Sequence, residues 1–311
     1  MTTRLITAPS VILIAQPQLI VGSIDQFAAE QGLSVIADNP ATPLGRISAQ
    51  SCDTSKADDI HNDGEALIEF AGRQCYHAWE KGRSPEAYIE NILQMGHGSV
   101  LAHAQWSFML TGISRSLTLE LNRHGTGTAI SQESQRYVDA STVKFVVPPA
   151  LLHLWGGTTD CQDAFDFLND NEQQIDAYNR WQEEVNSMVG DYDLYPLDPW
   201  LARVTDYTTA EDRESKAKKK RETMLRKRAN ETARAVLPND CETKMVWSAN
   251  ARALRYIISL RGAEDADLEI RRFAAQLAIQ CKVAAPTIFK DVEIGAGDFG
   301  VPVTTTVYHK V

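Results

Sequence analysis

Apolar residues recur three and four positions apart in several long segments of the chain, a spacing that places them on one face of an α-helix. The pattern predicts helices over residues 63–79, 85–95, 164–189, 229–237 and 267–284. Gly96 follows the second of these segments as a stop signal. Ser114 predicts a further helix to about residue 124, because a serine hydroxyl can accept from the free N–H groups of a first turn.

Shorter runs rich in β-branched and aromatic residues predict strands. Bulky and smaller side chains alternate over residues 104–110, and Gly112 is expected to end that strand. Another short strand is expected at 144–147, where two prolines follow. Residues 242–260 fit either one apolar helix or a strand followed by a helix, and residues 287–311 carry mixed strand signals.

Turn-forming residues predict where regular structure stops. Residues 1–60 mix short β-branched runs with Pro, Gly and Asn, so strands and loops are expected there. Residues 125–130 hold two glycines and two threonines and are expected to form a loop. The sequence contains no internal repeat and no separating linker, which predicts a single domain over 1–311. Its core is expected at about 60–150 and 225–295, with a helical insertion at about 156–220.

The charge balance limits the kind of partner. The chain has 31 Lys and Arg against 41 Asp and Glu, a formal net charge of −10. Broad nucleic-acid binding needs a basic face, so no nucleic-acid partner is expected, although a small positive pocket remains possible. The basic run at 216–228 is interpreted as a solvated helix face, because Glu211, Asp212 and Glu214 come just before it. A nucleic-acid contact there is the alternative.

Neither a membrane segment nor a disulfide framework is indicated. The longest N-terminal apolar run, 11–15, ends at Gln16, far short of the roughly 20 residues that span a bilayer. No secretory signal precedes it. The five cysteines are odd in number, far apart and without a CxxC pair, which favours free thiols in a reducing compartment. A protein of the cytoplasm, without a membrane partner, is therefore expected.

The segment 97–137 concentrates residues that bind anions. A loop of Gly, Thr and Ser lies between Arg123 and Arg136, where backbone N–H groups, hydroxyls and guanidinium groups can converge on a phosphate or another dianion. The alternative is that these arginines pair with Glu120 and Glu133 on a surface loop. Neither Walker spacing nor GxGxxG is present, so this is not one of the common nucleotide loops.

A second group of polar residues lies near the C-terminus. Asn250 and Arg261 are eleven residues apart, close to three helical turns, and would share one largely apolar helix face. An arginine at the end of such a face needs an anion or a carboxylate. A salt bridge to Glu264 or Asp265 is as good an interpretation as a ligand. Arg234 is a third candidate.

The sequence gives little support for a metal site or for a nucleophilic serine. His97 and His103 are six residues apart, which is no ligand spacing on a helix, and no Glu or Cys completes a set, so no metal is expected. Ser134 could act as a nucleophile with His124 or His103, but no GxSxG element is present. A binding role for Ser134 is preferred.

Residues 123–137 read RHGTGTAISQESQRY. The run resembles the signature of the flavin-dependent thymidylate synthase (ThyX) family, Arg-His-Arg, a short spacer, then Ser with Arg-Tyr two and three residues on. It is similar to the subgroup whose spacer is one residue longer. Other family elements appear in order over 65–290, namely HGS at 97–99, SRSLTLEL at 114–121, ETARAVLP at 231–238, NARAL at 250–254 and LRG at 260–262.

The resemblance implies both a fold and a reaction. The fold is α+β, with a mixed or antiparallel sheet flanked by long helices. Methylene passes from methylenetetrahydrofolate to C5 of dUMP, reduced FAD supplies the hydride, and NADPH reduces the flavin again. By the same resemblance the enzyme is a homotetramer whose active sites are shared between chains.

The resemblance also implies roles for individual residues. Arg261 is the catalytic residue, meeting the uracil ring and favouring its N3-ionised form. The residues implied to bind dUMP are Glu120, Arg123, Gln132, Glu133, Ser134, Gln135, Arg136, Arg234 and Arg261. Those implied to bind FAD are His97, Ser99, Arg123, His124, Gly125, Gln132, Asn250, Arg252 and Tyr256.

The chain departs from the family pattern at five positions. Gly125 replaces an Arg, Ala102 a Glu, Glu120 a Gln, Tyr256 an Asn and Asp265 a His. Two alternatives follow. One is a related C5-modifying enzyme, such as a dUMP or dCMP hydroxymethylase, in which water reaches the methylene intermediate before hydride does. The other is a non-catalytic nucleotide- or flavin-binding homologue, although such a protein has no need of Arg123, Ser134, Arg136, Arg234 and Arg261 together.

Overall fold

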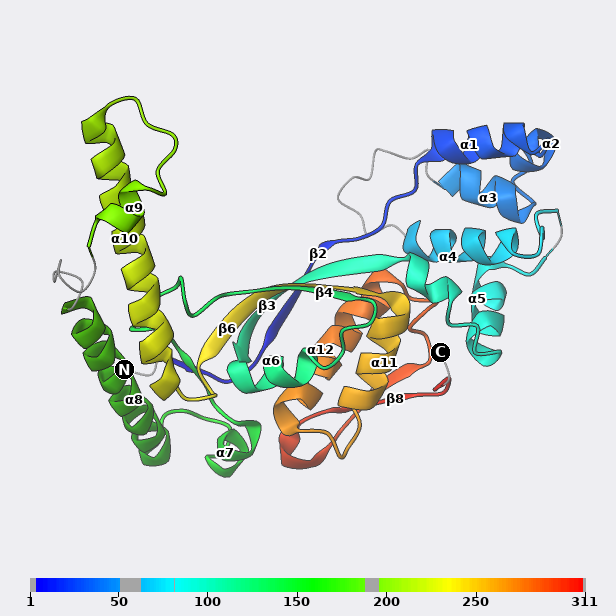
Figure 1. Ribbon diagram of the computed structural model, residues 1–311. Coiled ribbons are helices and arrows are strands. Elements are labelled where there is room, and N and C mark those ends of the chain that lie inside the picture. Colours follow the sequence, from blue (N-terminus) through cyan, green and yellow to red (C-terminus); the bar gives the residue numbers. More distant parts are fainter. Residues whose placement is uncertain (1–3, 51–62, 81, 188–195, 310–311) are drawn as a thin grey trace.

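A four-stranded antiparallel sheet forms the centre of the computed structural model, which describes residues 4–50, 63–80, 82–187 and 196–309. The strand order is β2-β3-β6-β4 (Figure 1). These strands are β2 (Ser10–Ala15), β3 (Gln105–Ser114), β6 (Glu242–Asn250) and β4 (Thr128–Gln132). The order interleaves distant segments, so strands from the two halves of the chain lie side by side.

One face of this sheet carries the main core. Alternate residues of β3 and β6 are buried, and Phe108 lies opposite Trp247 in the register. Two long helices, α11 (Ala251–Arg261) and α12 (Leu268–Ala284), cover that face with Leu254, Ile258 and Phe273. The shorter α6 (Arg115–Leu121) completes the layer below the sheet in Figure 1.

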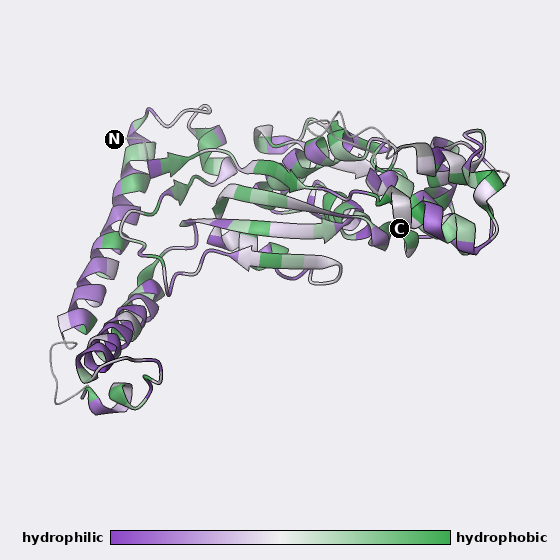
Figure 2. Ribbon diagram, turned by 90° about the horizontal axis from the view of Figure 1, so that it is seen from above, coloured by the Kyte–Doolittle hydropathy of each residue, from purple (hydrophilic) through white to green (hydrophobic). Residues whose placement is uncertain are grey.

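The opposite face of the sheet has no helix over its middle (Figure 2). Side chains there alternate with the buried ones, because successive residues of a strand point to opposite faces. Ile12 and Ile14 are each 51% exposed and Val246 is 39% exposed. This is an apolar face turned to solvent.

The N-terminal third adds helices beyond one end of the sheet. These are α1 (Val21–Glu30), α2 (Ser34–Ala37), α3 (Pro43–Gln50), α4 (Asp63–Gln74), α5 (Pro85–Gln94) and the 3-10 turn η3 (Val100–His103). Pro85 lies in the first turn of α5, the Ser84 hydroxyl accepts from Ala87 N, and Gly96 follows with a φ of +67°. Those features begin and end the helix where the sequence predicts.

A helical arm projects from the other end of the sheet (Figure 1). It consists of α8 (Gln162–Ser187), α9 (Asp198–Leu201), α10 (Ala210–Ala233) and the 3-10 turn η5 (Arg234–Val236). The two long helices pack through small and apolar side chains such as Ile175, Tyr178 and Leu225, while their outer surfaces are hydrophilic (Figure 2).

Small elements close the remaining edges. β1 (Leu5–Ile6) pairs in parallel with β5 (Phe145–Val146), and β7 (Val292–Gly295) with β8 (Val303–Thr306) forms an antiparallel pair. α7 (Pro149–Leu154) and η6 (Asp298–Gly300) lie near each other below the sheet. Within the described ranges, no helix is long and apolar enough to cross a membrane.

The α+β class with an antiparallel sheet and long flanking helices is confirmed. Helices occur in all the segments that the apolar spacing predicts, with ends shifted by a few residues. Residues 242–260 form a strand followed by a helix, the second of the two interpretations. The predicted end of α8 at residue 189 lies outside the described residues.

The expectation of strands and loops throughout residues 1–60 is wrong for 21–30, 34–37 and 43–50, which are helical. The apolar residues of α1 and α3, Ile24, Ala28, Leu44 and Ile47, pack around the buried Trp79. Val35 and Ile36 gave a local strand signal but belong to α2. Packing against Trp79, which is distant in the sequence, stabilises these helices over the locally predicted strands. Residues 51–60 lie outside the described ranges.

Two glycine-based expectations also need correction. Gly112 does not end β3; with a φ of +65° it lies in a register shift between Leu110 and Ile113, and the strand continues to Ser114. The loop expected at 125–130 stops at Thr128, where β4 begins to pair with β6. In both places a partner strand from elsewhere in the chain outweighed the local turn signal.

Candidate functional site

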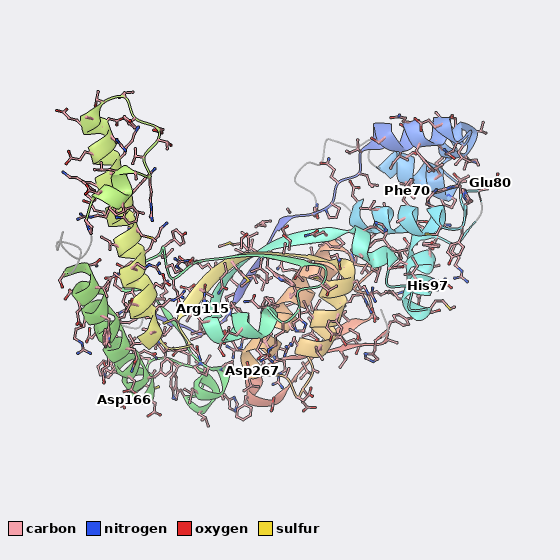
Figure 3. All side chains as sticks on the ribbon, viewed as in Figure 1. Phe70, Glu80, His97, Arg115, Asp166 and Asp267 are labelled. Carbon is pink, nitrogen blue, oxygen red and sulfur yellow. The ribbon has the colours of Figure 1, made fainter. Side chains whose placement is uncertain are left out.

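The residues implied as site residues fall into three main groups in a single chain. The α11 cluster comprises Glu120, Arg123, His124, Tyr256 and Arg261. The α5 cavity is lined by His97, Ser99 and Arg252, among others. The α10 foot comprises Arg115, Ser134, Arg136, Glu231 and Arg234. Figure 3 shows His97 and Arg115 at opposite ends of the sheet, so the α5 cavity and the α10 foot are well separated.

The α11 cluster is built around one guanidinium group. Arg261, in the last turn of α11, places Nη1 2.9 Å from Glu120 Oε2 and donates from Nε to His124 Nε2 at 2.8 Å. Arg123 Nη1 lies 3.2 Å from the other carboxylate oxygen of Glu120. The His124 ring meets the Tyr256 ring edge-on, with centroids 5.8 Å apart. Residues from α6, the following loop and α11 thus meet at one point.

The electrostatics of this cluster keep His124 neutral. Burial, and then the positive charge of Arg261, lower the pKa of His124 below its ordinary value. A neutral imidazole has one acceptor nitrogen, which is the role that His124 Nε2 has toward Arg261. The side chain of Arg261 is 17% exposed, while that of Arg123 is 69% exposed. Arg261 is therefore held in place and Arg123 is accessible.

Asn250 and Gly127 fix the loop against the start of α11. Asn250 is the N-cap of the helix, and its Oδ1 accepts from Ala253 N at 2.9 Å. Gly127 has a φ of +75°, and a Cβ there would lie 2.6 Å from Asn250 Nδ2. Glycine is needed at 127 because both the backbone conformation and the close approach exclude a side chain. Asn250 is thus the N-cap of the helix whose last residue is Arg261.

The α5 cavity has a volume of about 390 Å³. His97, Ser99 and Arg252 line it, together with Tyr76 and Tyr88. Imidazole, hydroxyl and guanidinium groups donate hydrogen bonds, and tyrosine rings offer flat surfaces. The donor set therefore fits part of an anionic group with a planar ring system, such as a flavin nucleotide.

The α10 foot brings arginines together with few carboxylates. Arg136 Nη2 lies 3.3 Å from Glu231 Oε2. Arg115 and Arg234 form no ion pair within the described part of the chain, and burial followed by the charge of Arg234 lowers the pKa of Arg115. Two neighbouring guanidinium groups without a carboxylate are a receptor for an anion. The Ser134 hydroxyl accepts from Arg136 N at 3.4 Å, a positioning contact for the loop.

Four more of the implied site residues lie outside these groups. Glu133 and Gln135 line a separate cavity of about 170 Å³ with Lys144 and Lys244. Gln132 donates from Nε2 to the hydroxyls of Thr118 and Thr243, at 3.0 and 3.2 Å. Gly125 has open space around it, since a Cβ added there would meet nothing within 4 Å.

The local ion pairs considered from the sequence are partly wrong. Arg123 does pair with Glu120, as that interpretation states. Arg136 pairs with Glu231 in place of Glu133, and Arg261 pairs with Glu120 in place of Glu264 or Asp265. The end of α11 points Arg261 toward α6, so its partner is 141 residues away instead of three or four.

Sequence reasoning gave no role to Arg115, which the fold places beside Arg234. Its position directly after the N-cap Ser114 fixes it at the start of α6. The Ser-Arg pair in the run 114–121 was the available signal.

Comparison with known proteins identifies the relatives of this chain. Residues 59–287 match the family described as thymidylate synthase complementing protein. A flavin-dependent thymidylate synthase of Mycolicibacterium vanbaalenii is 38% identical over 247 residues, covering 78% of this chain and 85% of the relative. The enzyme of the same name from Mycobacterium tuberculosis is 37% identical over 247 residues, with the same coverage.

Proposed function

Because this chain belongs to the flavin-dependent thymidylate synthase family, we propose that it converts dUMP to dTMP at the residues described above. Methylenetetrahydrofolate is the one-carbon donor and NADPH the reductant in this proposal, and the reaction takes place in the cytoplasm. The observation that carries the proposal is the guanidinium group of Arg261, held at the end of α11 by Glu120 and His124.

Arg261 supplies positive charge to the pyrimidine. C5 of uracil is a weak nucleophile, and an anionic ring carries more electron density there. A guanidinium group beside the ring stabilises the anion, and charge-assisted hydrogen bonds contribute about 1.5–3 kcal/mol each. Nε and Nη1 of Arg261 are occupied by His124 and Glu120. The Nη2 group is left for the substrate, because no partner within the described residues uses it.

Glu120 and His124 position this group. The carboxylate fixes one edge of the guanidinium plane and the neutral imidazole fixes Nε, so the remaining donors have a set direction. In the family pattern a Gln occupies position 120. The Glu120 carboxylate of this chain orients Arg261 more firmly than a Gln amide would, and it offsets part of the positive charge of Arg261.

His97, Ser99 and Arg252 would hold part of FAD, with Tyr256 and His124 further along the outer surface of α11. The flavin supplies the hydride for the reaction. Arg252 provides positive charge for its phosphates, and Ser99 and His97 provide hydrogen bonds. The alternation of donors and aromatic rings along one surface supports this assignment.

A homotetramer with shared sites is part of the proposal. The α10 foot would bind the phosphate of dUMP, while the α5 cavity of another copy would hold the flavin beside its base. Two observations support this assembly. The α10 foot and the α5 cavity lie at opposite ends of the sheet in one chain, and the apolar side chains of Ile12, Ile14 and Val246 are exposed on the open sheet face. Such a face is typical of an interface between copies.

The organisation of residues 1–311 as one domain with a helical insertion also stays a prediction.

The test is a product assay with flavin-loaded protein. dUMP, methylenetetrahydrofolate and NADPH are supplied, and the nucleotide product is identified by mass spectrometry. The expected product is dTMP, heavier than dUMP by one methylene group, and Arg261→Ala should form it at least about a hundredfold more slowly. A hydroxymethyl product would establish the alternative C5 chemistry. No product from protein that binds flavin and dUMP would overturn the proposal.

A further inference from the structure

The basic run of α10, which the proposed reaction does not use, lines a cavity of its own. The cavity has a volume of about 590 Å³ and lies between α9 and α10, on the arm at the far left of Figure 1. That volume is within the range of small-molecule sites. The lining residues on α10 recur at helical spacing and so form one face: Lys216, Lys219, Lys220, Thr223, Met224 and Lys227.

Positive charge on this face is in excess. Asp206 is the one carboxylate among the described lining residues. Lys216 uses it, with Nζ 2.9 Å from Asp206 Oδ1 and 3.1 Å from Asp212 Oδ2. Lys219 and Lys220 form no ion pair within the described ranges, and Lys220 Nζ donates only to the Arg203 carbonyl at 3.3 Å. A bound anion would neutralise these cations.

Two other cations of the run are paired with carboxylates off the cavity face. Lys218 pairs with Glu214 at 2.8 Å, and Arg228 pairs with Glu231 at 3.2 Å. The run thus divides into a compensated face, with Lys218 and Arg228, and the cavity face, on which Lys216 alone of its lysines has carboxylate partners within the described ranges. Like charges three or four residues apart destabilise a helix. The lysines on the cavity face therefore lower the stability of α10 unless a bound anion neutralises them.

The cavity also offers apolar surface. The Arg203 guanidinium carbon lies 4.6 Å from the centroid of the Trp200 ring, and Met224 lines the same space. Tryptophan and arginine planes are surfaces on which a base can stack. Lys227 Nζ lies 4.2 Å from the centroid of the Tyr137 ring, which connects the cavity to the loop of the α10 foot.

We propose that this cavity binds a nucleoside polyphosphate, with its phosphates on Lys219 and Lys220 and its base on Trp200. A concave site of this size holds one small ligand. A long nucleic acid would meet the acidic side chains of Glu211 and Glu214 in the first turns of α10 and a chain of net charge −10. The cavity shares no residue with the α11 cluster, so this assignment does not depend on the proposed reaction.

The test is isothermal titration of flavin-loaded protein with ATP, inorganic tripolyphosphate and a single-stranded oligonucleotide. ATP is expected to bind with an affinity that falls as salt rises. The double variant Lys219→Ala/Lys220→Ala should weaken ATP binding at least about tenfold, and Trp200→Ala at least about threefold. The matched control is Lys218→Ala, which lies on the compensated face and should leave ATP binding unchanged.

The other outcomes are equally decisive. Arg261→Ala should bind ATP as the unchanged protein does, which separates this cavity from the proposed active site. Absence of ATP binding, or ATP binding that survives the double variant, would overturn the assignment. If tripolyphosphate binds as tightly as ATP and Trp200→Ala has no effect on ATP binding, the proposed contact between the base and Trp200 is refuted. If the oligonucleotide binds more tightly than ATP, the proposal that the cavity holds a small ligand is refuted.

Discussion

Glu120 is the residue whose replacement tells most about Arg261. Its carboxylate contacts the guanidinium groups of both Arg261 and Arg123. Glu120→Gln removes one negative charge with little change in size. We expect the Kd for dUMP to fall about threefold to tenfold, because the site becomes more positive, and kcat to fall, because Arg261 is less firmly oriented.

Titration calorimetry and steady-state kinetics measure the two effects separately. Glu30→Gln is the control, since Glu30 is exposed on α1 and accepts only from Gln26 within the described ranges. If neither Kd nor kcat responds to Glu120→Gln, the carboxylate does not act on Arg261 during binding or turnover.

His124 predicts a pH dependence in the same cluster. Its pKa is lowered in the folded chain by burial and by Arg261, so the unfolded state takes up its proton at higher pH than the folded state. The stabilisation is complete above the unfolded pKa of about 6.5 and is lost as pH falls through the folded pKa. Protonation also removes the acceptor for Arg261 Nε.

The Tm of the unchanged protein should therefore fall more steeply below about pH 6.5 than that of His124→Gln, because other acid-sensitive groups are common to both. An NMR titration of the ring gives the pKa directly. A His124 pKa at or above its ordinary value would contradict the neutral imidazole that this account assigns to it.

Among the elements, β3 depends most on a single glycine. Gly112 has a φ of +65°, and a Cβ there would lie 2.8 Å from the Ala8 carbonyl oxygen. Gly112→Ala should reduce the free energy of unfolding by about 1–3 kcal/mol, through backbone strain and this contact. Gly125→Ala is the matched control, because a Cβ at Gly125 meets nothing within 4 Å. Urea unfolding measures both, and equal effects would show that the register shift tolerates a side chain.

The elements that the sequence predicts best are those defined by local signals. α5 has Ser84 and Pro85 at its start and Gly96 after its end, and each acts within one turn of the chain. α1 and α3 were missed because they are stabilised by packing on Trp79, far along the sequence. β4 was missed for the same kind of reason, since a short edge strand forms only where β6 offers a partner.

The candidate site was predictable in its residue types but not in its pairings. The sequence pointed to Arg261 and to an anion or carboxylate partner for it. Local spacing favoured Glu264 or Asp265, whereas the fold brings Glu120 to it. Arg115 beside Arg234 is a second pairing of this kind. Contacts between distant segments depend on topology, which apolar periodicity does not specify.

At the scale of the whole molecule, the proposed phosphate site and the proposed flavin site lie apart in one chain. The α10 foot and the α5 cavity lie at opposite ends of the sheet, so the dUMP phosphate and the flavin of one active site would be held by different copies (Figure 3). The open sheet face and the projecting arm are surfaces on which copies can associate. Assembly would place the α10 foot of one copy beside the α5 cavity of another.

Complementation between inactive variants tests this claim most directly. Arg252→Ala disables the α5 cavity and Arg136→Ala disables the α10 foot, so each variant alone should be inactive. If each site takes the two groups from different copies, co-assembled oligomers contain some sites with both groups intact. They should regain about a quarter of the dTMP formation of the unchanged protein. Mixed oligomers that are as inactive as either parent would contradict the account.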